Sequence, residues 1–352
     1  MKNNKLEGSP RRQLWASKRN TIQPKSYNLR PEEMVEVDQL HSDATLPLVI
    51  RPRVDGIKLS AWIGHNYDLV QSYLLKFGGI LFRGFGLTSD DDFKEVLSCI
   101  PVDLMHYMEG ATPRTELGNK VYTSTEFPPE QHIAPHNELC YVMTWPMKIW
   151  FYCVVPAAKG GQTPITDVRR VFNRLDSRIK NRFMDKGWAL VRNFGHRMGL
   201  PWQRSFRINE KSELEAYFRQ ACIEYEWKAD DHLKTRQVRP CVSTHPTTGE
   251  SVWFNHAAFW HVSSLEPELR NMLLESYGEE GLPFNTYYGN GSVIEDEVIA
   301  EVREAYRLES TSFLWERGDF LMLDNMLTAH GRFPYEGRRV ILTAMGEPYS
   351  RA

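Results

Sequence analysis

The chain has no hydrophobic run long enough to cross a membrane. No window approaches the roughly 18 consecutive apolar residues of a transmembrane helix. The basic and polar segment 1–26 also lacks the apolar middle of a secretion signal. These two absences predict a protein without a membrane partner, and the default expectation is a cytoplasmic location.

An excess of charge of one sign is also missing. The 352 residues include 43 lysines and arginines and 45 aspartates and glutamates, which leaves a formal net charge of -2. Nucleic-acid-binding proteins normally carry a strongly basic surface. The balance therefore predicts that the partner is not a nucleic acid.

Paired cysteines are absent as well. The five cysteines are odd in number, widely spaced and without a CxxC motif: Cys99, Cys140, Cys153, Cys222 and Cys241. This spacing argues against a disulfide framework and against a zinc knuckle. It indicates free, buried thiols in a reducing compartment.

The chain also contains no internal repeat and no low-complexity tract. We expect a flexible or loosely docked N-terminal arm over residues 1–30 and one domain over residues 31–352. Strand patterns occur at 46–52, 78–85, 148–156, 311–325 and 338–348. Helical patterns begin after Ser89 and near Asp167, and they also cover 215–227, 266–278 and 294–310.

Strands therefore lie near both ends of the chain, with helices inserted between them. This order does not alternate strand and helix as a parallel α/β sheet does. It predicts an α+β domain with a mainly β core, either a sandwich or a barrel, decorated by helices.

A short motif, His136-Asn137-Glu138, opens the aromatic run "PHNELCYVMTWPMKIWFY". In a strand, His136 and Glu138 project from the same face. Two histidines and one carboxylate on one side of a metal form the site typical of non-heme iron oxygenases. The triplet alone is equally compatible with an ordinary surface pair.

A distant histidine is needed to complete such a site. His330, in "LDNMLTAHGR", follows a predicted strand and is the best candidate, while His256 and His261 compete with it. The aromatic neighbours of His256 and His261 suit supporting positions better. A zinc hydrolase with the same ligands remains an alternative, although the chain has no HExxH motif.

Two arginines follow His330 closely. Arg338 and Arg339 begin the last predicted strand eight and nine residues after His330. A guanidinium group binds a carboxylate through two parallel hydrogen bonds, so one of them suits the distal carboxylate of 2-oxoglutarate. Strand alternation directs one arginine inward and the other outward.

Long motifs in this order are similar to one known family. The segments "APHNELCY", "WPMKIWFYCVVPAAKGGQTPITDVRRVF" and "RGDFLMLDNMLTAHGRFPYEGRRVILTAM" resemble the TauD/TfdA family of iron(II)/2-oxoglutarate dioxygenases, and its SyrP-like, clavaminate synthase-like branch in particular. The likeness runs from about residue 45 to the C-terminus. It implies a double-stranded β-helix, or jelly-roll, with helices outside.

The resemblance also implies roles for particular residues. It assigns Fe(II) to His136, Glu138 and His330, with 2-oxoglutarate and O2 as cosubstrates. Arg339 rather than Arg338 is expected to bind the 2-oxoglutarate carboxylate, because in the family the arginine immediately before the apolar strand points into the pocket. Thr163 of "GGQTP" is expected to be its hydroxyl partner.

Two departures from the family pattern narrow the expected substrate. Taurine-type members carry an arginine for the anionic substrate four residues beyond the 2-oxoglutarate arginine, and this chain has Thr343 there. Halogenating relatives replace the carboxylate ligand with Gly or Ala, whereas this chain has Glu138 in an HxE motif where many members have HxD. A sulfonate substrate and halogenation are therefore disfavoured.

The resemblance implies an amino-acid-like substrate, free or tethered to a carrier protein, and hydroxylation of an unactivated C–H bond in specialised-metabolite biosynthesis. Desaturation or cyclisation at the same iron, and a non-catalytic jelly-roll that binds a ligand or carrier, are the alternatives. The candidate substrate contacts are Ser124, Thr125, Glu126, Gln203 and Asn255.

Overall fold

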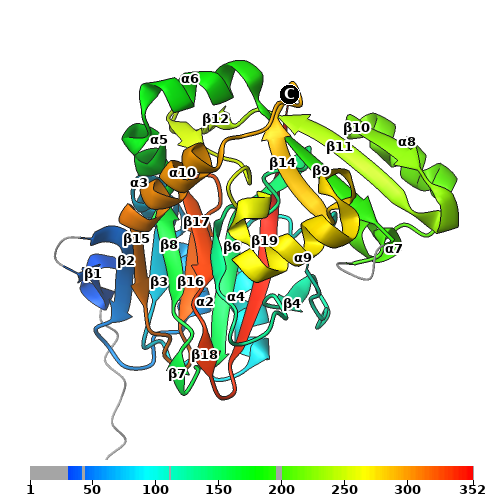
Figure 1. The fold of residues 1–352 in the computed structure, drawn as a ribbon. Helices are drawn as coiled ribbons and strands as arrows, with labels where there is room; N and C mark the ends of the chain where they lie inside the picture. The colour runs from blue at the N-terminus through cyan, green and yellow to red at the C-terminus, as the bar shows by residue number, and fades with distance from the viewer. Residues whose placement is uncertain (1–30, 42–43, 111, 196–199, 352) are drawn as a thin grey trace, which may run out of the picture.

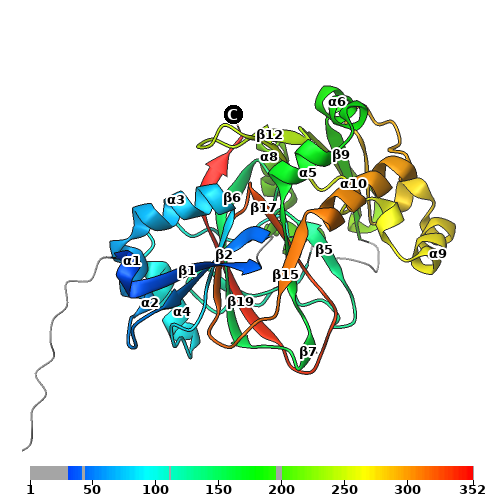
Figure 2. The ribbon, with the colours of Figure 1, turned by 90° about the vertical axis from the view of Figure 1, so that its left-hand side faces the viewer.

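A computed structural model of the chain describes residues 31–41, 44–110, 112–195 and 200–351. The arm predicted for residues 1–30 lies outside the described residues. The centre of the fold is a pair of sheets with helices packed on the outside (Figures 1 and 2). This is the predicted α+β class with a double-stranded β-helix core.

The larger sheet contains segments from both ends of the described chain. Its strand order is β1 (Val35–His41), β2 (Ala44–Pro52), β3 (Gly79–Phe82), β16 (Phe320–Asp324), β6 (Thr144–Val155), β19 (Val340–Ser350) and β4 (Val121–Thr123). Strands β2 and β3 pair in parallel, and the other neighbours are antiparallel. The terminal strand predicted at 338–348 is confirmed as β19, beside β6.

The smaller sheet has the order β15 (Ser310–Phe313), β8 (Thr163–Asp167), β17 (Thr328–Arg332) and β5 (Ile133–His136). A two-stranded ribbon of β18 (Tyr335–Glu336) and β7 (Lys159–Gly160) continues beyond it. The predicted strand–turn–strand at 311–325 therefore places β15 in the smaller sheet and β16 in the larger one.

Strand β6 shows why the apolar run at 148–156 does not alternate with polar residues. Ile149 and Phe151 belong to the core between the two sheets. Trp150 and Tyr152 face the other way, into a second core. Helices cover that outer face, so both sides of β6 are buried.

Three helices supply the outer cover: α2 (Leu59–His65), α3 (Tyr67–Phe77) and α4 (Asp90–Ser98). Figure 2 shows them on the side of the molecule opposite α9 (Pro267–Tyr277). The predicted start of α4 is confirmed, because the Ser89 hydroxyl accepts a hydrogen bond from the Asp92 amide and the Asp92 carboxylate accepts one from the Ser89 amide. This capping box satisfies two amide groups that the helix itself leaves unpaired.

A third sheet lies beside the core, with the order β10 (Ile223–Trp227), β11 (Leu233–Arg239), β9 (Trp188–Phe194) and β14 (Phe284–Tyr288) (Figure 1). Its accompanying helices are α7 (Trp202–Phe206) and α8 (Lys211–Gln220). The remaining α-helices and strands are α1 (Pro31–Met34), α5 (Val168–Arg174), α6 (Ser177–Lys186), α10 (Asp296–Leu308), β12 (Val242–Thr244) and β13 (Ser251–Trp253).

The helix predicted over 215–227 is wrong in its second half. Helix α8 ends at Gln220, Cys222 takes a positive φ of 51°, and the chain continues as β10. Along β10 the burial alternates from residue to residue, as expected for a strand with one covered face. None of the described helices is long and apolar enough to span a membrane.

Candidate metal centre

His136 and Glu138 meet a histidine that is distant in sequence, His330, at the end of the smaller sheet. His136 is the last residue of β5, Glu138 follows it, and His330 lies within β17. His136 and His330 are direct partners across the two strands, and their ring centroids are 4.6 Å apart. One potential ligand atom from each of the three residues lies within 4.8 Å of the others. Two imidazoles and one carboxylate at this spacing suit a divalent transition metal.

The carboxylate reaches this position through a turn, which corrects one expectation from the sequence. Strand β5 ends at His136, so Glu138 does not lie on the same strand face. Leu139 has a positive φ of 54°, and the chain reverses before β6 begins at Thr144. Glu138 is nevertheless buried, with an exposed fraction of 4%.

Asn325 holds the peptide of Glu138 in place. Its Oδ1 accepts a hydrogen bond from the Glu138 amide at 2.7 Å, and its Nδ2 donates to the Glu138 carbonyl at 2.8 Å. The Asn137 side chain donates to the Asn325 carbonyl at 2.7 Å. Asn137 therefore turns away from the two candidate ligands, whereas no local sequence pattern indicated the role of Asn325.

The two histidine rings are held by different contacts. Nδ1 of His136 lies 2.9 Å from the Ala134 carbonyl, which favours the tautomer with a proton on Nδ1 and a free Nε2. The His136 ring also packs against Phe259, with centroids 4.7 Å apart, and His330 packs against Phe151 at 4.9 Å. Nδ1 of His330 is buried and has no hydrogen-bond partner among the described residues.

Burial favours the neutral form of both rings. It lowers the pKa of His136 and lowers that of His330 well below its ordinary value, because a charged imidazole is poorly solvated there. Neutral imidazole nitrogen is the form that binds a metal. The donor set therefore fits a divalent cation.

An arginine that the sequence reasoning missed lies against Glu138. Nη2 of Arg114 is 2.7 Å from Oε2 of Glu138, and the two side chains are only 4% and 5% exposed. Burial alone raises the pKa of Glu138, but the charge and the hydrogen bond of Arg114 outweigh burial and lower it. Glu138 therefore remains a carboxylate.

Arg338 and Arg339 differ in burial, although both lie just before β19, which begins at Val340 and not at Arg338 as predicted. Arg338 is exposed, whereas Arg339 is largely covered and its Nε donates to the Gly161 carbonyl at 3.2 Å. Its guanidinium lies 5.6 Å from the Tyr335 ring centroid. Burial, assisted by the charge of Arg332, lowers the pKa of Arg339 to about 10, so it is a cation near neutral pH.

Thr163 begins β8, on the same side of the sheet as the candidate metal centre. Ile165 pairs with His330, and Thr163 stands two residues earlier, so the two β8 side chains share a face. Nε1 of Trp315 donates to the Thr163 hydroxyl at 2.9 Å. The hydroxyl proton of Thr163 can therefore serve another acceptor.

The three candidate substrate contacts at 124–126 differ in how they are connected to the candidate metal centre. The Thr125 hydroxyl lies 3.4 Å from Nη2 of Arg114, next to the candidate metal centre. Glu126 is exposed, and its carboxylate accepts hydrogen bonds from Thr115 and Thr123. The Ser124 amide donates to the Ile341 carbonyl. Within this segment Thr125 has the most direct connection to the centre.

The other two candidates have partners elsewhere. Gln203 donates to Asp231 at 3.3 Å. Asn255 is buried, donates to the Cys241 carbonyl and accepts from the Ala257 amide, which commits both ends of its amide to backbone groups.

The competing histidines are not part of the close group. Nε2 of His256 is 2.8 Å from the Asn137 carbonyl, and its ring lies 5.6 Å from that of His136. His261 instead accepts a hydrogen bond from the Ser263 amide. His256 thus supports the turn between the candidate ligands.

Thr343 is buried in β19, at the position where taurine-type relatives carry an arginine. It pairs with Phe151 on one side and with Tyr122 on the other. Since cross-strand partners share a face and Phe151 packs on His330, Thr343 points toward the same interior.

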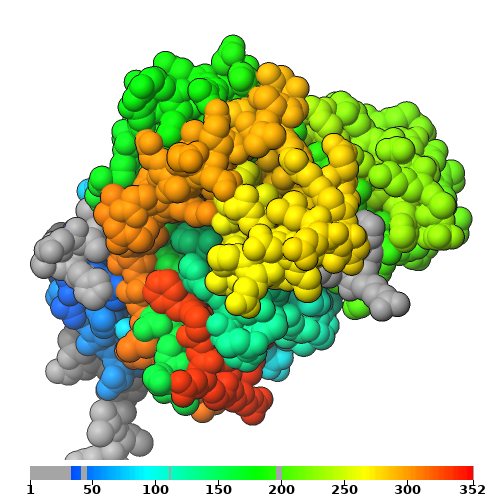
Figure 3. Space-filling model, viewed as in Figure 1, coloured from blue at the N-terminus to red at the C-terminus, as the bar shows by residue number. Residues whose placement is uncertain are grey.

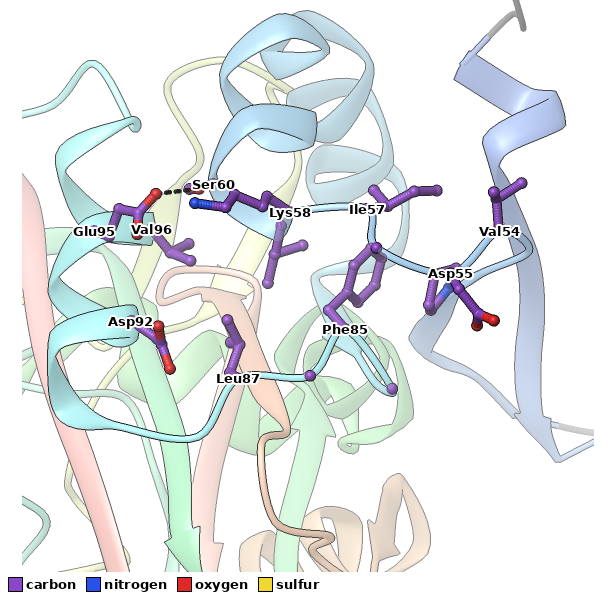
Figure 4. A pocket seen from close by; sticks show the side chains of 15 residues that line it. Val54, Asp55, Ile57, Lys58, Ser60, Phe85, Leu87, Asp92, Glu95 and Val96 are labelled. Carbon is purple, nitrogen blue, oxygen red and sulfur yellow. Dashed lines mark hydrogen bonds between the residues drawn. The ribbon is translucent and has the colours of Figure 1, made fainter. Parts of the chain in front are cut away.

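Two cavities differ in their relation to the centre. A cavity of about 530 Å³ lies between α2, α4 and the loop after β3, with Ser60 hydrogen-bonded to Glu95 at its edge (Figure 4). None of the three candidate ligands lines it. A smaller cavity of about 120 Å³ is lined by Arg114 and Tyr122, next to the centre. In the space-filling view, the yellow segment around α9 covers the middle of one face, beside the turquoise segment that precedes β5 (Figure 3).

The comparisons with known proteins agree with this geometry. The model of the family described as "Taurine catabolism dioxygenase TauD, TfdA family" matches residues 39–345. The dapdiamide synthesis protein DdaC of Enterobacter agglomerans is 36% identical over 323 residues, covering 92% of this chain and 95% of the relative. A clavaminate synthase-like protein of Arabidopsis thaliana is 28% identical over 290 residues, covering 78% and 83%.

Solved structures show the same fold at low identity. PvcB, described as an Fe, alpha-ketoglutarate dependent oxygenase from an isonitrile synthetic pathway, superposes with a TM-score of 0.53 at 15% identity, over 92% of this chain and 94% of that chain. AAD-2 in complex with Mn(II) and N-oxalylglycine gives a TM-score of 0.53 at 14% identity, over 90% and 99%.

Proposed function

Since this chain belongs to the TauD/TfdA family and is an iron- and 2-oxoglutarate-dependent oxygenase, we propose that it hydroxylates an unactivated C–H bond of an amino-acid-like substrate in specialised-metabolite biosynthesis. The substrate is a free amino acid or one tethered to a carrier protein. The 36% identity to a dapdiamide synthesis protein supports the biosynthetic role.

We assign the iron ligands to His136, Glu138 and His330. The observation that carries this assignment is the approach of one donor atom from each residue to within 4.8 Å. Iron, 2-oxoglutarate and O2 together supply the oxidising power, and the overall reaction yields hydroxylated product, succinate and CO2.

The residues of the chain bind and orient the reactants. Arg339 and Thr163 are assigned to the distal carboxylate of 2-oxoglutarate, which a guanidinium and a hydroxyl suit as hydrogen-bond donors. The packing of Phe151 on His330 and of Phe259 on His136 keeps the rings fixed and excludes water from one side. A fixed geometry directs oxidation to one substrate carbon.

The test uses purified protein with Fe(II), ascorbate, 2-oxoglutarate and a panel of amino acids, free and carrier-bound. Mass spectrometry is expected to find a product heavier by one oxygen, with matching formation of succinate. Loss of two hydrogens instead indicates desaturation or ring closure. The His136→Ala variant is expected to lose 2-oxoglutarate turnover, and the exposed His65→Ala variant is expected to keep it.

A wild-type protein that binds neither iron nor 2-oxoglutarate contradicts the assignment and favours a non-catalytic jelly-roll. Zinc on metal analysis, with hydrolytic activity that needs no O2, favours the hydrolase alternative.

A further inference from the structure

The guanidinium of Arg114 is buried beside the candidate metal centre with part of its hydrogen-bonding capacity unused. Nη2 contacts Glu138 at 2.7 Å, and the guanidinium lies over the Tyr107 ring, 4.3 Å from its centroid. Nε and Nη1 are also buried, and neither has an acceptor among the described residues. Leaving donors of a buried cation unpaired is costly, so an acceptor is expected in the working enzyme.

The charge of Arg114 is balanced by one carboxylate that has a second task. Glu138 is its ion-pair partner, and Glu138 is also the carboxylate assigned to iron. A divalent cation at the centre draws on the same negative charge. The guanidinium then needs a further anion to be neutralised in this poorly solvated place.

The small cavity beside the centre has the charge that such an anion requires. Three arginines line it, Arg114, Arg204 and Arg207, against a single carboxylate from Glu116. Glu116 is paired with Arg207 at 2.9 Å. Arg204 is exposed and forms no ion pair within the described part of the chain.

The cavity also has a defined place relative to the reacting centre. Tyr122 lines it and pairs with Thr343, whose other strand neighbour, Phe151, packs on His330. At about 120 Å³ it is smaller than a typical pocket for a whole ligand. It has the size for one end of a substrate whose remainder extends toward the iron.

We propose that Arg114 binds a carboxylate group of the primary substrate through Nη1, which has two N–H groups and no acceptor among the described residues. This inference rests on the proposed function and names the chemical class that the site selects, a carboxylate-bearing substrate. Thr125, whose hydroxyl lies 3.4 Å from Nη2, borders the same position. Arg339 is the separate cation assigned to 2-oxoglutarate.

The experiment measures binding as well as turnover. The probes are L-amino acids, and each is compared with its own α-carboxamide. Aspartate and glutamate are also compared with their side-chain amides. For the tethered form, the aspartyl pantetheine thioester is compared with the asparaginyl one. Binding is followed without O2, by the change in the visible absorption of the Fe(II)–2-oxoglutarate complex. The wild type is expected to bind at least one acid about 10- to 100-fold more tightly than its amide.

The variants are Arg114→Gln, Arg114→Lys and, as a charge control on the surface of α8, Arg219→Gln. Arg114→Gln is expected to bind the acid no better than the amide while retaining affinity for 2-oxoglutarate. The Arg114→Lys variant is expected to show part of the wild-type preference for the acid over the amide. The Arg219→Gln control is expected to keep the full preference. Retained 2-oxoglutarate binding also shows that the variants are folded.

Three results overturn the inference. A wild type that binds no acid more tightly than its amide contradicts a carboxylate site. An Arg114→Gln variant that binds iron and 2-oxoglutarate and keeps the acid preference contradicts the role assigned to Arg114. A variant that loses iron or 2-oxoglutarate shows that Arg114 serves Glu138 or the cosubstrate instead. In each case wild-type binding of iron and 2-oxoglutarate leaves the proposed function standing, whereas failure of that binding refutes the proposed function itself.

Discussion

Asn325 is the residue whose removal tests most directly how the candidate metal centre is built. It is fully buried, and its side chain makes three hydrogen bonds to backbone groups. Two of them join the amide and the carbonyl of Glu138, and the third joins the Pro146 carbonyl at 2.8 Å. The change Asn325→Ala removes all three and leaves these backbone groups without their partner.

The expected loss of stability follows from those contacts. Each intramolecular hydrogen bond contributes about 1 kcal/mol net, and a buried backbone N–H left without an acceptor costs roughly a further 1 kcal/mol or more. The free energy of unfolding should therefore fall by roughly 3–4 kcal/mol. The control, Asn290→Ala, removes hydrogen bonds to Ser292 in an exposed turn and should cost less than about 1 kcal/mol.

The same change should weaken metal binding, because the peptide of Glu138 is no longer fixed. Loss of a group that orients a ligand typically lowers metal affinity by about 10- to 100-fold. Chemical denaturation measures the first effect, and titration with Fe(II) or Co(II) measures the second. The reasoning is refuted if Asn325→Ala is no more destabilising than Asn290→Ala, or if stability falls while metal affinity stays unchanged.

Two further predictions concern 2-oxoglutarate binding and acid stability. Arg339→Gln should raise the KM for 2-oxoglutarate by about 10- to 100-fold, because a charge-assisted pair of hydrogen bonds is lost. Arg338→Gln, at the exposed neighbour, should change this KM by less than about 2-fold. Equal effects of the two variants in steady-state kinetics would contradict the assignment of Arg339. Burial, aided by the charge of Arg303, lowers the pKa of His261 from 6.5 to about 4. The contribution of the neutral ring to the free energy of unfolding is therefore complete above pH 6.5, and it is lost as the pH falls toward 4. His261→Asn keeps the side-chain acceptor for the Ser263 amide without the titrating ring, so between pH 7 and 4 the wild type should lose up to about 3 kcal/mol more stability than the variant. Parallel stability curves from denaturation at each pH would argue against this account.

Much of the fold was predictable from local patterns. The capping box at Ser89 and the terminal strand β19 are encoded within a few residues of the chain. The prediction of one helix over 215–227 failed because only the first part of the segment has helical periodicity. Its second part, "IEYEW", alternates with a period of two. The single residue between them that adopts a positive φ, Cys222, carries no strong turn preference, so the boundary was not visible.

The candidate site was predictable in its donor residues but not in their surroundings. The order of His136, Glu138 and His330 indicated three donors, and the structure brings them together. Arg114 had no comparable signal, because its contact with Glu138 spans 24 positions and depends on how the loop before β4 folds. The sequence shows which residue types are present, whereas burial decides which charges meet.

The turn between β16 and β17 joins the two halves of the candidate centre. It begins with Asn325, which fixes the Glu138 peptide, and it leads within five residues to His330 in β17. The preceding residue, Asp324, accepts hydrogen bonds from the amides of Met326 and Leu327 and so closes the turn. One strand–turn–strand unit therefore supplies the third donor and positions the second, while pairing of β17 with β5 positions the first. The HxE motif does not need a continuous strand, because the distant turn at 325–327 replaces strand alternation as the device that aligns Glu138 with both histidines.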